Sequence, residues 1–227
     1  MKNSERKPFF RLVKRVLSLF ISRPYFCKDD AEIKNGSIFI CNHVGSTVPL
    51  KLELHFNRPF KFWGTYEMTF SFKERWNYLA YTYFYKKKHN PLWLAKIKAS
   101  LANPFVGMFY KGMQLIPTYQ DLRLIKTIKY SVDYLESGKN IVVFPENSSD
   151  GYHEVLKEYY AGFLLLAKKF YEQTNKDINI YNMYYRKKDN RMLFDRVYSI
   201  SEIIKDTRDI RIIASEFKNR ANFLANS

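Results

Sequence analysis

Two strand-like runs in this sequence each end in a side chain that can move a proton or carry charge. The run 37–41 ends in Asn42 and His43, and the run 140–145 ends in Glu146. Because the carboxyl ends of parallel strands meet at one edge of a sheet, His43 and Glu146 are expected to lie close together there. Imidazole is the most frequent general base in enzymes, so this edge predicts proton-transfer chemistry.

The elements that position these residues alternate between strands and helices. This alternation predicts an α/β fold, with a mostly parallel central sheet flanked by helices. We divide the chain into an amphipathic helix (1–25) and an α/β domain (26–227) with a helical insertion at about 70–111. Strands are predicted at 37–43, 60–65, 112–117, 140–144, 177–184 and 191–199, and helices at 8–22, 50–57, 121–137, 153–173 and 206–225.

Aromatic and lysine side chains are interleaved through the predicted insertion, which divides into two helices at residues 89–91. Aromatic rings beside lysines are typical of a membrane interface or of a groove that binds an acyl chain. A helical insertion packed on the sheet explains the same pattern, and so does stacking on single-stranded nucleic acid. No RNP-type strand pattern accompanies these residues, which argues against a nucleic-acid binder.

Residues 8–22 have the pattern of an amphipathic helix, because apolar residues recur at helical spacing. Arg11, Lys14 and Arg15 fall on the other side. A basic flank beside an aromatic and leucine face is typical of a helix that lies in a membrane interface. A helix that caps the globular core has the same pattern, so both alternatives stay open. The apolar residues are Phe9, Leu12, Val13, Val16, Leu17 and Phe20.

The formal charge of +16 and the pI of about 9.7 favour an anionic partner, such as nucleic acid, anionic lipid headgroups or phosphorylated substrates. A compositional bias toward Lys, Asn, Ile, Phe and Tyr explains the same charge without a partner. No run approaches the roughly 18 apolar residues that span a bilayer, and the basic N-terminal helix argues against a secretory signal peptide. Cys27 and Cys41 fit neither a metal spacing nor a disulfide framework, which indicates a reducing, cytosolic compartment.

Four short blocks follow one another along the chain in a recognisable order. Asn42-His43 precedes a helix, a run from Gly112 to Ile116-Pro117 comes next, and Phe144-Pro145-Glu146-Asn147-Ser148 precedes a further helix and a distal strand. This order resembles the PlsC-like glycerolipid acyltransferase superfamily, over roughly residues 30–200. The positions that match the family's blocks are Asn42, His43, Gly112, Phe144, Pro145, Glu146 and Gly162.

Other positions depart from the family's pattern. Val48 stands where the family has the Asp of its His-x4-Asp motif, and Gln120 stands where it has an Arg. Asn147-Ser148 replace Gly-Thr, and Asn182 stands where Pro is usual. The chain therefore looks like a divergent member of the superfamily.

The resemblance implies an acyltransferase of phospholipid biosynthesis. It moves a fatty acyl group from acyl-CoA or acyl-carrier protein to a lysophospholipid-like acceptor, with no bound cofactor and no metal. His43 is the implied general base. Because Val48 cannot orient an imidazole, we expect another carboxylate to do so: Glu67 first, just past the strand 60–65, and Glu53 second.

The same resemblance implies which residues bind the acceptor. Arg123 or Lys111 would replace the missing arginine as the phosphate-binding cation. The implied acceptor-binding residues are Asn42, Gly112, Gln120, Arg123, Phe144, Pro145, Glu146, Asn147 and Ser148.

The implied location is the cytoplasmic face of the cell membrane, where the protein would be peripheral or monotopic on an anionic leaflet. Each basic residue near such a surface contributes about 1 kcal/mol. The alternative is a catalytically impaired acyltransferase fold that binds lipid or acyl-carrier protein.

Overall fold

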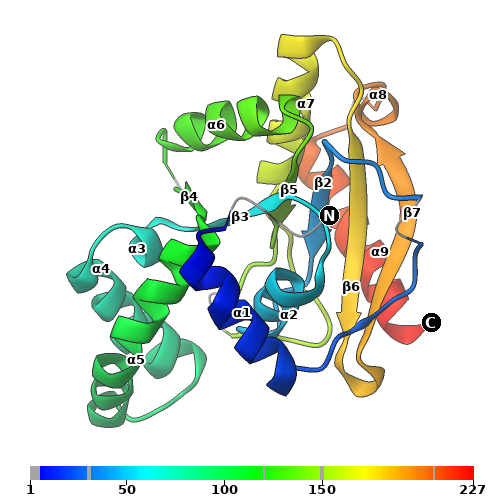
Figure 1. Cartoon of the computed structure of the whole chain (residues 1–227). Coiled ribbons are helices and arrows are strands. Elements are labelled where there is room, and N and C mark those ends of the chain that lie inside the picture. The colour runs from blue at the N-terminus through cyan, green and yellow to red at the C-terminus, as the bar shows by residue number, and fades with distance from the viewer. Residues whose placement is uncertain (1–5, 30–31, 120, 149–150, 207) are drawn as a thin grey trace.

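The computed structural model describes residues 6–29, 32–119, 121–148, 151–206 and 208–227. A seven-stranded, mostly parallel sheet with helices on both faces forms its centre, so the predicted fold class is confirmed (Figure 1). The strand order is β1-β7-β6-β2-β5-β3-β4, and among the described strands β6 and β7 pair antiparallel. The strands are β1 (Tyr25–Phe26), β2 (Ile38–Cys41), β3 (Phe60–Thr65), β4 (Ile116–Thr118), β5 (Asn140–Val143), β6 (Asn179–Arg186) and β7 (Arg191–Ser199).

The central strand β2 is buried along its whole length because both faces of the sheet are covered. Successive side chains of a strand point to opposite faces, so Ile38 and Ile40 enter one core while Phe39 and Cys41 enter the other. Burying an aliphatic or aromatic side chain of this size stabilises the fold by about 1.5–3 kcal/mol. The first core is covered by α6 (Leu124–Glu136), α7 (Gly162–Thr174), α8 (Ile200–Ile203) and α9 (Ile210–Asn226), and the second by α1 (Pro8–Phe20) and α2 (Thr47–His55).

The helical insertion lies between β3 and β4 and has a small core of its own, formed by Met68, Leu79, Ala80 and Ala99. One of its helices is a π-helix, η2, which spans Tyr78–Lys87. π-Helical segments are rare and occur frequently at functional sites. The boundary between two helices that was predicted at residues 89–91 falls between η2 and α5. The other helices of the insertion are α3 (Tyr66–Thr69), α4 (Phe72–Asn77) and α5 (Leu92–Met113).

The structure corrects the strand predicted at 112–117. Helix α5 continues through Gly112 and Met113 and ends at Gln114, whose left-handed backbone (φ 53°) closes it, so β4 begins only at Ile116. Gly112 has a packing role there, because a β-carbon at this position would overlap the ring of Phe10 in α1. The absent side chain therefore lets α1 lie against α5.

The helix predicted at 153–173 is also corrected, since α7 begins only at Gly162. The segment before Gly162 is not helical and instead pairs with the chain that follows β5. Glu146 and Tyr159 form an antiparallel bridge, and the N–H of Tyr160 donates to the carbonyl of Pro145 over 2.8 Å. The backbone N–H and C=O groups that a helix would use are therefore bonded to the chain after β5.

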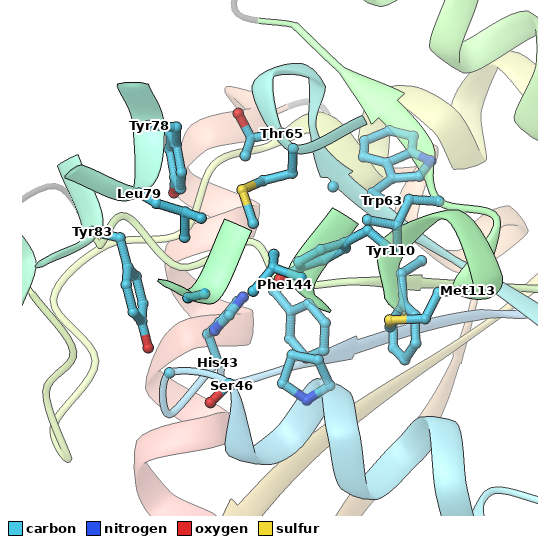
Figure 2. Close-up of a pocket in the computed structure, with 18 of the residues that line it drawn as sticks. His43, Ser46, Trp63, Thr65, Tyr78, Leu79, Tyr83, Tyr110, Met113 and Phe144 are labelled. Carbon is cyan, nitrogen blue, oxygen red and sulfur yellow. The ribbon is translucent and has the colours of Figure 1, made fainter. Parts of the chain in front are cut away.

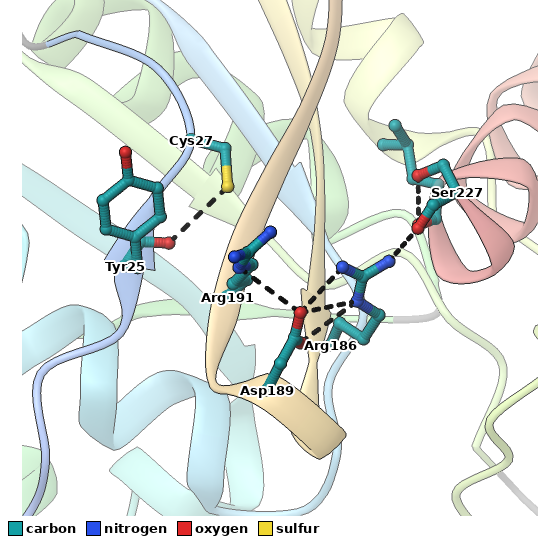
Figure 3. Close-up of polar contacts among 7 residues, drawn as sticks. Tyr25, Cys27, Arg186, Asp189, Arg191 and Ser227 are labelled. Atoms are coloured by element: carbon teal, nitrogen blue, oxygen red, sulfur yellow. Dashed lines mark hydrogen bonds and ion pairs between the residues drawn. The ribbon is translucent and has the colours of Figure 1, made fainter.

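The hairpin between β6 and β7 is fastened at its turn by charged side chains (Figure 3). Asp189, in the 3₁₀ turn η3 (Lys187–Asp189), accepts hydrogen bonds from Arg186, and Arg191 lies 3.4 Å away. Arg186 also donates to the carbonyl of Ser227, which ties the end of α9 to the same turn. These contacts thus link the β6–β7 turn to the end of α9.

Candidate active site

Asn42 extends the pairing of β2 with β6 by one residue. Its Oδ1 accepts from the N–H of Tyr185 over 2.7 Å, and its Nδ2 donates to the Tyr185 carbonyl over 3.1 Å. The side chain is almost completely buried, at 2% exposed. The structure therefore places this predicted substrate-binding residue inside the sheet, where it fixes the point at which His43 leaves β2.

His43 begins a tight turn whose backbone is strained. Val44 and Gly45 both have left-handed conformations, with φ of 40° and 63°. A β-branched residue is rarely found there, and such a conformation costs about 1–3 kcal/mol. Surrounding contacts must hold this turn, as is common where a fold positions a reactive side chain.

The imidazole of His43 lies among aromatic rings. It meets the edge of Phe144 at 4.7 Å between centroids and stacks on Tyr152 at 5.1 Å with an angle of 22°. Nδ1 is buried, and within the described part of the chain it has no hydrogen-bond partner. Burial first, and then the nearby Lys87 ammonium, lower the pKa of His43 to about 4. The ring is thus neutral at physiological pH, with a lone pair available to accept a proton.

Glu146 lies beside His43, which confirms the expected proximity of the two strand ends. Its Oε2 accepts a hydrogen bond from the backbone N–H of His43 over 3.0 Å. Burial raises the pKa of Glu146, while hydrogen bonds from the backbones of His43 and His153 act against that rise. The carboxylate therefore fixes the loop that carries the imidazole.

Neither of the carboxylates expected to orient His43 pairs with its ring. Glu67, in α3, accepts a hydrogen bond from the hydroxyl of Thr65, the last residue of β3. Glu53 is fully buried and binds Arg6 through two hydrogen bonds of 3.1 and 2.9 Å.

A second cation also holds Glu53, because Lys14 of α1 lies 2.8 Å from Oε1. Arg6 donates to the carbonyl of Phe60 as well, at the amino end of β3. His43 stands at the carboxyl end of the parallel strands, so Glu53 belongs to the opposite end of the sheet. The expectation that Glu53 orients His43 is therefore corrected, because Glu53 anchors the N-terminal segment through Arg6 and Lys14.

A cavity of about 220 Å³ opens beside the imidazole, between the sheet and the insertion. In Figure 2, Tyr78, Leu79 and Tyr83 lie on one side of His43, and Tyr110 and Met113 lie on the other. Burial raises the pKa of Tyr110 to about 12, so its hydroxyl stays protonated. Further lining residues are mostly apolar: Phe62, Trp63, Met68, Phe84, Val106, Leu115 and Phe144. Such a cavity can hold a short apolar group next to His43.

The predicted acceptor-binding residues separate into two groups. Phe144 lines the cavity, and the Ser148 hydroxyl accepts from Lys87 Nζ over 2.7 Å. Asn147 instead donates to Glu158 over 2.7 Å and supports the loop, and the Pro145 carbonyl is bonded within it. Gly112 packs against α1 and does not line the cavity, while Gln120 lies outside the described residues.

Arg123, proposed to replace the family's arginine, is half-exposed and already paired. Its guanidinium forms an ion pair with Asp121 at 2.7 Å and lies 4.3 Å from the ring centroid of Tyr119. This pairing raises the pKa of Arg123 and lowers that of Asp121. Lys111 is exposed on α5, and neither cation lines the cavity.

The sequence did not reveal that Lys87 and Tyr152 lie at the site. Lys87 ends the π-helix, and its Nζ lies 5.4 Å from the ring centroid of Tyr152, which itself stacks on His43. Both come from segments that fold back over the edge of the sheet. The run Lys86-Lys87-Lys88 at the end of an aromatic helix is the available signal, but it fits a membrane interface, an acyl-chain groove or a packed insertion equally well.

Within the described ranges, no three His, Cys, Asp or Glu side chains gather in a position to hold a metal ion. No helix there is both long and apolar enough to cross a membrane. Comparison of the chain with protein-family models finds no match, and comparison with curated proteins finds none either.

Proposed function

We propose that this chain is an acyltransferase, which moves a fatty acyl group from a thioester donor to a hydroxyl of a lysophospholipid-like acceptor. The observation that carries the proposal is the neutral imidazole of His43, with a buried, unpaired Nδ1, at the mouth of an apolar cavity. A general base must be unprotonated before it acts, and the acyl chain needs a dry site next to it.

In the proposed reaction the oxygen of the acceptor hydroxyl attacks the thioester carbon, and His43 accepts the proton of that hydroxyl. An ester bond forms, the carbon–sulfur bond breaks, and the imidazolium returns the proton to the leaving thiolate. Acyl-CoA and acyl-carrier protein are both donors of this kind. The apolar wall contributes to chain binding, at about 0.8 kcal/mol for each methylene removed from water.

Helix α5 offers a surface that suits a membrane. It lines the cavity with one face, while large apolar side chains on the opposite face are 45–70% exposed. These follow one another every three or four residues, so they form one stripe, and Lys96 and Lys98 flank it. The stripe, called here the α5 stripe, consists of Trp93, Ile97, Leu101, Phe105 and Met108.

Helix α1 lies beside α5 (Figure 1) and carries exposed apolar side chains of its own. Phe10 packs into the second core and meets Phe109 of α5 at 5.2 Å, so the helix does contribute to the fold. Its other side exposes Phe9, Leu12, Val16, Leu19 and Phe20. We propose that both helices lie on the anionic cytoplasmic leaflet as a peripheral attachment, consistent with the charge of +16.

One observation favours a second candidate, a lipid- or acyl-carrier-binding fold without turnover. Among the described residues no carboxylate pairs with the His43 ring, and the Lys87 ammonium opposes its protonation. Loss of the orienting carboxylate in a serine-protease triad lowers the rate about 10⁴-fold. An imidazolium without a counter-charge forms with difficulty in a buried site.

The test is thiol release from acyl-CoA or acyl-carrier protein by purified protein, on anionic vesicles that contain lysophosphatidic acid. His43→Gln should lower the rate about 10²-fold or more, whereas His89→Gln, at an exposed position, should not. Equal rates in the wild type and His43→Gln would overturn the assignment of the base. Vesicle binding without thiol release would establish the second candidate.

A further inference from the structure

Two lysines at the end of the π-helix converge on the ring that stacks against His43. Lys87 Nζ lies 5.4 Å from the centroid of Tyr152, and Lys88 Nζ lies 5.9 Å from it. Lys88 also reaches the strained turn, since a β-carbon built at Gly45 would lie 3.8 Å from its Nζ. Two positive charges therefore border the loop that carries the imidazole.

Within the described ranges, these charges have no close acidic partner. No carboxylate of the described residues forms an ion pair with Lys87 or Lys88, and the hydroxyl of Ser148 is the partner of Lys87. Glu146 is near enough to influence Lys87, but it is buried and its Oε2 binds the backbone of His43. Burial lowers the pKa of Lys87, and the negative charge of Glu146 acts against that fall.

Burial and the Lys87 ammonium lower the pKa of His43, while hydrogen bonds with the backbones of Gly45 and His43 act against that fall. Lys87 and Tyr83 belong to η2 and Lys88 follows its last residue, while Phe144, Glu146 and Tyr152 lie in the chain after β5. The aromatic rings exclude water, the Lys87 ammonium opposes an imidazolium, and the Glu146 carboxylate binds main chain. Among the described residues, the site is therefore short of negative charge at the place where the proposed reaction would create a cation.

We infer that Lys87 and Lys88 form a phosphate-binding site beside His43, and that the bound phosphate supplies the counter-charge for the His43 imidazolium. The inference rests on the proposed function in assigning this phosphate to a substrate. A phosphate monoester carries about −1.5 to −2 charges at neutral pH, enough to offset both lysines. Lysine binds such a group as a point charge.

The anion takes the place of the carboxylate that Val48 cannot supply. Before it binds, His43 is a neutral and weak base; once it binds, protonation of the ring no longer adds to an excess of positive charge. Arg123 is paired with Asp121, whereas Lys87 acts on the imidazole and Lys88 borders the loop that carries it. Substrate would thus complete its own site. The phosphate could belong to the acceptor headgroup or to the donor's pantetheine or nucleotide arm.

The experiment is an NMR titration of the His43 ring, which needs no turnover. The pKa of His43 is measured in the full chain, alone and with inorganic phosphate, glycerol 3-phosphate or coenzyme A. His43→Gln identifies the signal. We expect a pKa well below 6.5 without anion, and a rise toward 6.5 when a phosphate binds. A response to glycerol 3-phosphate alone assigns the site to the acceptor, and one to coenzyme A alone assigns it to the donor.

Variants locate the effect. Lys87→Gln/Lys88→Gln should raise the pKa of His43 in the free protein and weaken binding of the effective probe by about tenfold or more. Lys86→Gln, which removes an exposed neighbour from the same helix, should behave as wild type. Lys87→Arg keeps the charge and should retain the response, which separates loss of charge from loss of folding.

Absence of any shift with all three probes would overturn the inference, as would a shift that persists in the double lysine variant. The proposed transferase activity can fail on its own, because a chain that never releases thiol would still show the titration shift if this site is real.

Discussion

The backbone N–H of His43 donates to Glu146 Oε2 over 3.0 Å, so the carboxylate at the end of one strand holds the main chain at the end of another. The two residues are 103 positions apart in the sequence, and β2 and β5 pair in parallel just before them. Their bond fixes where the imidazole stands, while the ring itself stays free to exchange a proton.

Removal of this carboxylate should loosen the loop. Glu146→Ala leaves buried backbone N–H groups without an acceptor, and we expect it to lower the free energy of unfolding by about 1–3 kcal/mol. Glu146→Gln keeps one oxygen acceptor and should cost less. Urea unfolding of the three proteins checks this order, and a Gln variant less stable than the Ala variant would contradict it.

The low pKa of His43 predicts a pH dependence of stability. Because the ring titrates near 4 in the folded chain and near 6.5 when unfolded, the unfolded chain binds more protons between these values. This contribution is fully present above about pH 6.5 and is lost as the pH falls toward 4.

His43→Gln removes that proton site, so its stability should fall less than that of the wild type between pH 7 and pH 4.5. Urea unfolding midpoints at the two pH values measure the difference. The matched control is His89→Gln, at an exposed histidine, which should follow the wild-type curve. Parallel curves for wild type and His43→Gln would mean that the imidazole is not held neutral by its surroundings.

Glu53 should prove structural. Glu53→Gln leaves the buried Arg6 guanidinium without its counter-charge, and removal of one partner of such a pair costs about 3–5 kcal/mol. Glu32→Gln, which breaks an exposed pair with Lys28, should cost under about 0.5 kcal/mol. Urea unfolding compares the two. A Glu53→Gln protein that is as stable as wild type but has a changed pH–rate profile would return Glu53 to the active site.

The close approach of α1 to α5 depends on Gly112. Gly112→Ala places a methyl group into the Phe10 ring and should destabilise the fold by about 1–3 kcal/mol. Phe10→Ala, costly alone, should remove most of the extra penalty when combined with Gly112→Ala. Lys111→Ala on the exposed side of the same helix serves as control. Additive effects of Phe10→Ala and Gly112→Ala in thermal unfolding would show that the two residues do not meet.

The α5 stripe should govern attachment to membranes. Leu101→Gln/Phe105→Gln removes two of its most exposed apolar side chains and should weaken binding to anionic vesicles about tenfold or more. Ile125→Gln changes a similarly exposed side chain on α6 and should have little effect. Vesicle sedimentation measures both. Equal losses in the two variants, or none, would exclude α5 as the contact.

The sheet could be predicted because its strands carry dense local signals. β3, β6 and β7 were each located to within a few residues from runs of strand-forming side chains bounded by turns. The strand predicted from Gly112 to Pro117 was wrong in its first half, because a short apolar run fits a helix end and a strand equally well. The packing of Gly112 against Phe10, a hundred residues earlier in the chain, is a contact that no local pattern contains.

The site, too, has residues that the sequence could predict and residues that it could not. His43 and Glu146 were predictable because parallel strands bring their carboxyl ends together, a rule of topology. Lys87 and Tyr152 were not, because their place depends on how the insertion and the segment 151–161 fold back over that edge. The choice of Glu67 and Glu53 failed to identify a ring partner because charge alone does not say which cation a carboxylate will meet.

The position of β2 in the sheet bears on how the chain acquires its structure. β2 pairs with β5 and β6, whose residues lie more than a hundred positions further along the chain. During synthesis the four apolar residues of β2 must therefore wait, with unpaired main chain, until most of the polypeptide has left the ribosome. The β6–β7 hairpin arrives late and completes the centre of the sheet. Slow folding and a need for chaperones are the expected consequences of this strand order.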